Sequence, residues 1–192
     1  VAVMGITPGG IVEVYWGRRL YDPHNHLAEA REIIQIFKAF RLDQIAHDYT
    51  GAGAVKESGL IQAGLGTRQL VPIRYASAPV APLMVFKKPK PPYGGRPHHV
   101  IDKTRSLIHT TTAIQLEKIK FFEYDHKSKE DPGLIHDFLA LTDRKVERER
   151  GSDLYIIGRL SGKSDDFAQA VNIGSCALWH RTKLWPKIDV DP

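Results

Sequence analysis

The start of the chain has the pattern of a β-hairpin. Residues 1–6 are mostly apolar, residues 7–10 (Thr-Pro-Gly-Gly) have the chemistry of a turn, and residues 11–16 are rich in β-branched and aromatic side chains. Two short runs of this kind on either side of a glycine turn are typical of antiparallel strands. We therefore predict a hairpin over residues 1–16.

The following segment alternates helical and strand-like patterns. Asn25 can cap a helix whose apolar positions recur at helical spacing. These positions are Leu27, Ala30, Ile33, Ile34, Phe37 and Phe40. Residues 44–47 form a candidate strand that ends at Asp48, and residues 54–63 and 69–75 form a second helix and a further strand. The order of elements predicts an α/β protein with at least one parallel crossover.

Residues 76–99 interrupt this regular pattern, because the segment is dense in proline. The prolines are Pro79, Pro82, Pro89, Pro91, Pro92 and Pro97. Since proline fixes φ and lacks a backbone donor, we predict an exposed excursion without a long regular element and without strand pairing. Lys87, Lys88 and Lys90 lie in this segment, where they are either solvated loop residues or contacts for an anionic partner.

The rest of the chain returns to alternating elements. Helical patterns cover residues 101–116 and 134–148, and strand-like patterns cover residues 119–122 and 154–157. Ser164 can cap a final helix that runs to about Trp179. The length fits one domain over residues 1–192.

Composition narrows the class of protein. Hydrophobic residues make up 42% and charged residues 26% of the chain, which excludes disordered and fibrous proteins. The single cysteine, Cys176, excludes an internal disulfide and a cysteine-based zinc cluster and fits a reducing compartment. With no apolar run of membrane-spanning length and no signal peptide, we expect a protein that is neither membrane-bound nor secreted. The chain lacks an initiator methionine, and we expect it to be a piece of a longer protein.

Asp48 is the most informative single residue. It ends an apolar strand and is followed by a Gly-Ala-Gly turn that leads into a helix. Ligands of open α/β sheets gather outside the carboxyl ends of strands, so a carboxylate there suits a binding site. An aspartate that bonds the backbone of its own turn explains the same position, and both interpretations stay open. The turn lacks the Gly-Lys-Ser/Thr of a phosphate-binding loop and the third glycine of a dinucleotide fingerprint.

A second acidic position opens the last predicted helix. Asp165 and Asp166 are adjacent there, where the helix dipole favours negative charge for stability alone. Mg²⁺ usually takes one or two carboxylates per ion, and a strand-end aspartate with a helix-start aspartate can supply them. We therefore predict that Asp48 and at least one of Asp165 and Asp166 have carboxyl groups within reach of a shared metal. Lys163, beside the pair, could neutralise a phosphate.

These pieces, in this order, resemble the C-terminal nuclease domain of large terminase subunits, the motors that package DNA into tailed-phage heads. The matching segments are residues 27–48, 49–53, 102–107, 119–122, 136–141 and 163–170. Together they span the chain from about residue 15 to 180. The most specific segment is Asp-Asp-Phe-Ala-x-Ala at residues 165–170.

The resemblance implies an α/β fold of the RNase H-like type, with a mixed sheet flanked by helices, and cleavage of double-stranded DNA with two Mg²⁺ or Mn²⁺ ions. Asp48 matches the second acidic ligand of the family, and Asp166, with Asp165 beside it, matches the last. The implied partners are double-stranded DNA, the portal and other terminase subunits, without a membrane. The implied location is the cytoplasm of an infected bacterial host.

The first catalytic aspartate of the family has no match in this chain. One alignment places Thr7 at its position but leaves too few strands before the first helix. The alternative takes residues 1–6 and 11–16 as the second and third strands, and we expect the first strand and its aspartate to lie upstream of Val1. No Walker motif is present, so the ATPase motor is absent from this sequence.

Three functions follow from these observations. The first is a metal-dependent endonuclease, favoured by Asp48 and Asp165–Asp166. The second is a catalytically inactive DNA-binding or portal-docking module, favoured by the missing aspartate, and the third is a junction-resolving nuclease. The net charge of +5 and a pI near 9.3 allow phosphate-led binding without sequence preference, with Lys163, Lys103 and Arg105 as candidate contacts. Each of these three cations serves solubility equally well.

Overall fold

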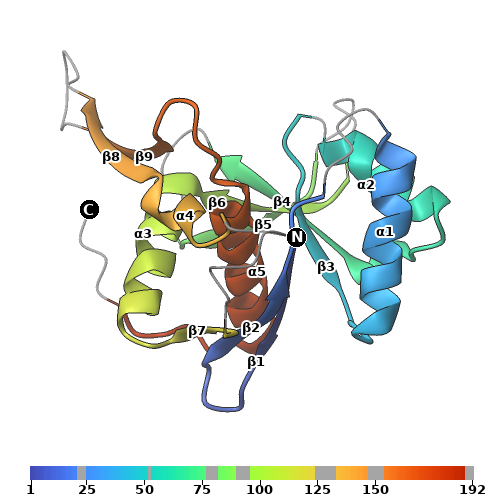
Figure 1. The fold of residues 1–192 in the computed structure, drawn as a ribbon, viewed down its shortest axis with the longest axis horizontal. Coiled ribbons are helices and arrows are strands. Elements are labelled where there is room, and N and C mark those ends of the chain that lie inside the picture. Colours follow the sequence, from blue (N-terminus) through green and yellow to red (C-terminus); the bar gives the residue numbers. More distant parts are fainter. Residues whose placement is uncertain are drawn as a thin grey trace. The chain divides into compact units, whose positions relative to one another are not determined.

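The computed structural model describes residues 1–20, 25–51, 53–76, 82–89, 96–123, 133–146 and 154–188 (Figure 1). Contacts divide the chain into two compact units, Val1–Arg19 with Lys103–Pro192, and Leu20–Asp102. We describe each unit by itself. The single domain predicted over residues 1–192 stays a prediction.

The class is mixed α/β, with mixed sheets flanked by helices, as the sequence predicts. The described strands pair in three sheets, where one was expected. Among the described residues, no helix has both the length and the apolar character that crossing a bilayer requires.

The N-terminal hairpin is confirmed. Strand β1 (Ala2–Ile6) pairs antiparallel with β2 (Val12–Gly17), and β2 pairs in parallel with β7 (Ile119–Phe121). Gly10 in the turn has φ of +81°, a conformation that favours glycine. The hairpin and β7 thus form the mixed sheet of the first unit.

Two helices, α3 (Lys103–Gln115) and α5 (Asp166–Thr182), pack with this sheet. The buried core contains Val12, Val14, Ala113, Ile119, Leu134, Phe167, Val171 and Trp179. A buried polar link joins the helices: the Thr110 hydroxyl donates to Asn172 Oδ1 over 2.9 Å, and Asn172 Nδ2 donates to Ser106 Oγ over 3.0 Å. Because each of these buried groups has a partner, the link fixes the position of α3 against α5.

The helix predicted over residues 134–148 is wrong. Within the described part of this range, residues 134–146, only a single turn, α4 (His136–Leu139), is helical. The chain continues as β8 (Leu141–Val146), which pairs antiparallel with β9 (Leu154–Arg159). Figure 1 shows the pair as a separate two-stranded ribbon. Strand pairing with β9 overrides the local helical spacing here.

The second unit contains a four-stranded sheet in the order β3 (Ile45–Asp48), β4 (Leu70–Ala76), β6 (His98–Asp102), β5 (Met84–Lys87). The first three run parallel and β5 is antiparallel to β6, so the predicted parallel crossover is confirmed. Two helices belong to this unit, α1 (His26–Ala39) and α2 (Gly53–Gln62). Asn25 caps α1 as predicted, because its side chain accepts from the Ala28 backbone over 3.0 Å. The core contains Ala30, Ile34, Phe37, Leu60, Leu65 and Leu70.

The predicted excursion over residues 76–99 needs correction. Strand β5 and the first residues of β6 lie inside it, and Met84 is buried. The prolines at 82, 89 and 97 fall outside both strands, so they limit the strands without preventing pairing. Residues 77–81 and 90–95, with Lys90, lie outside the described residues. The helix predicted from residue 101 begins at Lys103, because Ile101 and Asp102 are buried at the end of β6.

Candidate functional site

Asp48 lies at the carboxyl end of β3, as predicted. It pairs with Ile73 of the parallel neighbour β4, and its side chain is exposed. Its Oδ1 accepts a hydrogen bond from the Thr50 backbone over 2.8 Å, which is the turn contact expected of an aspartate. The residue therefore forms its own turn and also presents a carboxyl group at the sheet edge where α/β proteins bind ligands.

The turn after Asp48 depends on glycine at two positions. Gly51 has φ of +57°, and a Cβ on Gly53 would lie 2.0 Å from the Asp48 carbonyl oxygen. The Gly53 backbone also donates to the Thr50 carbonyl oxygen over 3.0 Å. The close approach of α2 to the end of β3 therefore requires a residue without a side chain at position 53.

Replacing Gly53 by alanine is expected to lower the free energy of unfolding by about 1–3 kcal/mol, because the added methyl group forces α2 away from Asp48. Gly158→Ala is the matched control, since a Cβ there meets nothing within 4 Å. Urea unfolding of both variants measures the difference. Equal stability of the two variants would contradict the close packing at Gly53.

A cluster of Glu57, His47 and Arg96 lies next to Asp48 and could not be recognised from the sequence. The buried carboxylate of Glu57, on α2, has Oε2 2.8 Å from His47 Nε2 and Oε1 2.8 Å from Arg96 Nη1. His47 Nδ1 in turn lies 3.2 Å from the Asp48 carbonyl oxygen. The cluster joins α2, β3 and the segment before β6, and so holds the backbone that carries Asp48. Only the packing of α2 against β3 brings Glu57 to His47, so sequence spacing gave no signal.

Asp165 and Asp166 lie at the start of α5, as predicted. Asp165 is the N-cap and is buried, with its carboxylate accepting from Gln169 Nε2 over 2.8 Å and lying 3.8 Å from Arg159 Nη1. Asp166 is exposed and accepts from the Ser164 hydroxyl over 3.0 Å. The cap predicted at Ser164 is therefore wrong by one residue: Ser164 precedes the N-cap Asp165, and its Oγ accepts from the Asp166 backbone over 3.2 Å. Of the pair, Asp166 presents the more accessible carboxyl group.

A further buried carboxylate, that of Asp137, binds the first turn of α5. Asp137 on α4 forms an ion pair with Arg19, and its Oδ2 accepts from the Phe167 backbone over 2.7 Å. One oxygen thus neutralises a cation and the other satisfies an unpaired N–H in the first turn of α5. Asp137 could not be recognised from the sequence, because its partners Arg19 and Phe167 are distant in the chain.

The structure leaves the metal site as a prediction. Asp48 belongs to the unit Leu20–Asp102, and Asp165 and Asp166 belong to the other unit, so their binding of one shared ion stays a prediction. Within the described ranges, no group of three or more histidine, cysteine, aspartate or glutamate side chains is arranged to hold a metal ion.

The three candidate DNA contacts lie in the same unit as Asp165 and Asp166. Lys103 and Arg105 are in the first turn of α3, and Lys163 is exposed in the loop before α5. The Thr104 hydroxyl accepts from the Ile157 backbone over 3.3 Å, which ties the start of α3 to β9. The start of α3, which carries Lys103 and Arg105, is thus tied to the strand that precedes Lys163.

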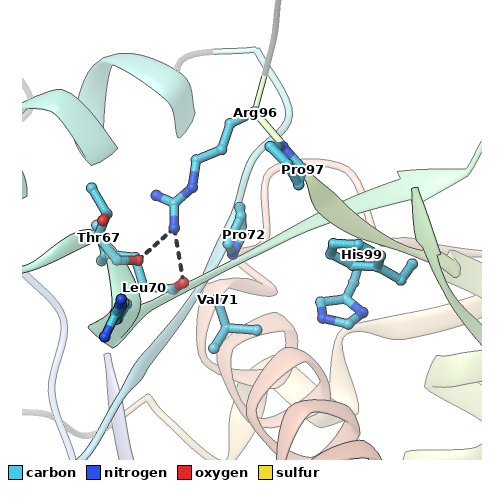
Figure 2. A pocket seen from close by; sticks show the side chains of 9 residues that line it. Thr67, Leu70, Val71, Pro72, Arg96, Pro97 and His99 are labelled. Atoms are coloured by element: carbon cyan, nitrogen blue, oxygen red, sulfur yellow. Dashed lines mark hydrogen bonds between the residues drawn. The ribbon is translucent and has the colours of Figure 1, made fainter. Parts of the chain in front are cut away.

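The second unit also contains a pocket of about 380 Å³ beside the start of β4 (Figure 2). Its walls include Arg68, Pro72, Phe86 and His99. Arg96 closes one side, and its Nη2 donates to the Thr67 carbonyl oxygen over 2.6 Å and to the Leu70 carbonyl oxygen over 3.2 Å.

Comparisons with family models, with curated proteins and with solved structures found no match to this chain.

Proposed function

We propose that this chain is the nuclease domain of a tailed-phage large terminase subunit. In this proposal the fold is RNase H-like, the substrate is double-stranded DNA, and two Mg²⁺ or Mn²⁺ ions support phosphodiester hydrolysis. The partners are the portal and other terminase subunits, in the cytoplasm of an infected bacterial host. The ordered motif segments and the placement of the acidic residues support it.

The observation that carries the proposal is the presentation of Asp48 and Asp166. One carboxyl group is exposed at the end of a parallel strand, and the other is exposed in the first turn of a helix. Carboxylate oxygens are the ligands that Mg²⁺ and Mn²⁺ prefer, so the donor set fits the proposed ions. Both residues also fall in the segments that resemble the terminase family.

In this proposal the acidic residues would bind the metal ions, and the basic residues would bind the DNA. Asp48 and Asp166, with Asp165, would hold the ions, which supply activation of water and stabilisation of the leaving oxygen. In this hydrolysis a water oxygen would bond to phosphorus as the bridging P–O bond breaks; the attacking water would lose a proton to solvent, and the leaving oxygen would take one from solvent. Lys163, Lys103 and Arg105 would hold the DNA by its phosphates.

Nicking of supercoiled plasmid in Mg²⁺ or Mn²⁺ tests the proposal. The protein is assayed as the present chain and in an extended form with any residues that its gene encodes upstream of Val1, where this proposal expects the first aspartate of the family. Metal-dependent nicking by the extended protein supports the nuclease. Plasmid binding without nicking by either protein would contradict it and favour an inactive DNA-binding module.

DNA binding is expected to weaken steeply with salt and to differ little between unrelated duplexes. Each neutralised phosphate contributes about −0.9 to the slope of log affinity against log salt concentration. Lys163→Ala removes one such contact, so its slope should be shallower by about 0.9. Lys38→Ala, at an exposed position on α1, is the control. Fluorescence anisotropy on two duplexes across a salt series measures both effects. A flat response, or strong preference for one duplex, would indicate a sequence-specific binder.

A further inference from the structure

The pocket beside β4 combines positive charge with aromatic and apolar walls. Arg68, Arg96 and His99 supply the basic groups, and Phe86 and Pro72 supply apolar surface. None of the described residues that line it carries a carboxylate. Its volume of about 380 Å³ lies in the range of small-molecule sites. This composition fits an anionic ligand that also has a flat ring.

The two arginines have different tasks. Arg96 is engaged with protein oxygens, because Nη2 binds two carbonyl groups and Nη1 pairs with buried Glu57. Its role is to hold the Thr67–Gln69 turn and the start of β4 together. Arg68 lies in that turn and is exposed, so its guanidinium can meet a phosphate in solvent.

The aromatic wall of the pocket lies on β5, the strand at the edge of the sheet. Phe86 on β5 is 53% exposed, and its ring lies 5.2 Å from the ring of its register partner His99 on β6. The cations that line the pocket beside this ring are Arg68 and Arg96, whereas Lys87 at the end of β5 and Lys88 after it are exposed outside the pocket lining. Exposed aromatic rings among cations are the pattern by which proteins bind unpaired bases, since every base has a face that can stack.

We propose that this pocket binds one unpaired nucleotide of a DNA strand, with the base against Phe86 and the phosphate at Arg68. A base within an intact duplex is stacked on its neighbours and cannot reach Phe86, so the site selects single-stranded DNA. The proposal rests on the proposed function for the choice of DNA as the polymer. Such a site would hold a frayed or newly cut strand.

Binding of a fluorescent oligothymidylate and of a duplex of equal length tests the site. Phe86→Ala is expected to weaken binding of the single strand about tenfold, the size of one lost base stack, and to leave duplex binding within about twofold. Phe86→Trp should retain parental affinity, with quenching of the new fluorophore on binding. Arg68→Ala should make the salt slope for the single strand shallower by about 0.7.

The matched controls are Phe40→Ala and Arg31→Ala, at exposed positions on or next to α1 in the same unit. They should leave both affinities unchanged. Three results would overturn the proposal. They are equal losses of single-strand affinity in Phe86→Ala and Phe40→Ala, equal losses of affinity for single strand and duplex in Phe86→Ala, and no oligonucleotide binding by the parent protein. If Phe86→Ala weakens single-strand binding but neither form of the protein nicks plasmid, the nuclease proposal is contradicted and the proposal of a nucleotide pocket is supported. If plasmid is nicked but Phe86→Ala binds the single strand with parental affinity, the pocket proposal is contradicted and the nuclease proposal is supported.

Discussion

Asp48→Asn is expected to lower metal-dependent DNA cleavage about a thousandfold and to leave DNA affinity within about twofold. The substitution keeps the acceptor oxygen that the Thr50 backbone needs, so the turn is preserved. It removes the negative charge that would hold a divalent ion in the proposed site. Such an ion supplies several kcal/mol to the transition state, and each 1.4 kcal/mol is tenfold in rate. Asp166→Asn is expected to have an effect of the same size.

Initial rates of plasmid nicking by the extended protein measure these losses. Asp43→Asn, at an exposed position just before β3, is the control and should cleave at the parental rate. Cleavage within tenfold of the parent by Asp48→Asn would show that this carboxylate has only its turn role.

Asp137→Ala is expected to have the largest effect on stability, a loss of about 3–5 kcal/mol in the free energy of unfolding. The substitution leaves the Arg19 guanidinium without its ion-pair partner and leaves the Phe167 N–H uncapped at the start of α5. Removal of one member of a buried pair is costly because the remaining charge is uncompensated. Denaturant unfolding followed by circular dichroism measures the change.

The control for this variant is Asp143→Ala, at an exposed position of β8 in the same unit. It should change stability by no more than about 0.5 kcal/mol. The double variant Arg19→Ala with Asp137→Ala should be more stable than the sum of the two single losses predicts. Additive losses, or a loss below about 1 kcal/mol for Asp137→Ala, would show that the pair contributes little.

Elements with local causes could be predicted from the sequence. The glycine turn defined the hairpin of β1 and β2, Asn25 defined the start of α1, and the apolar run before Asp48 defined β3. Two predictions failed where pairing with the next strand of the chain, rather than local spacing, decided the structure. Residues 141–146 became a strand because residues 154–159 pair with them, and residues 84–87 became a strand because β6 lies beside them.

The candidate site divides in the same way. Asp48, Asp165 and Asp166 were placed correctly at a strand end and a helix start, because those positions follow from adjacent residues. Glu57 and Asp137 were missed, since their partners Arg96 and Arg19 lie far away in the chain. A buried carboxylate of this kind can be recognised only in the folded structure, because its burial depends on a cation that is distant in the sequence.

Iron-directed cleavage of the protein backbone tests most directly whether Asp48 and Asp165–Asp166 hold the same metal. Fe²⁺ can replace Mg²⁺ at oxygen ligands and, with ascorbate and peroxide, generates radicals that cut the nearby chain. We expect cuts beside both Asp48 and Asp165–Asp166, suppressed together by excess Mg²⁺ and lost together in Asp48→Asn. Cuts at only one of the two positions, or cuts at Asp165–Asp166 that persist in Asp48→Asn, would contradict a shared metal site.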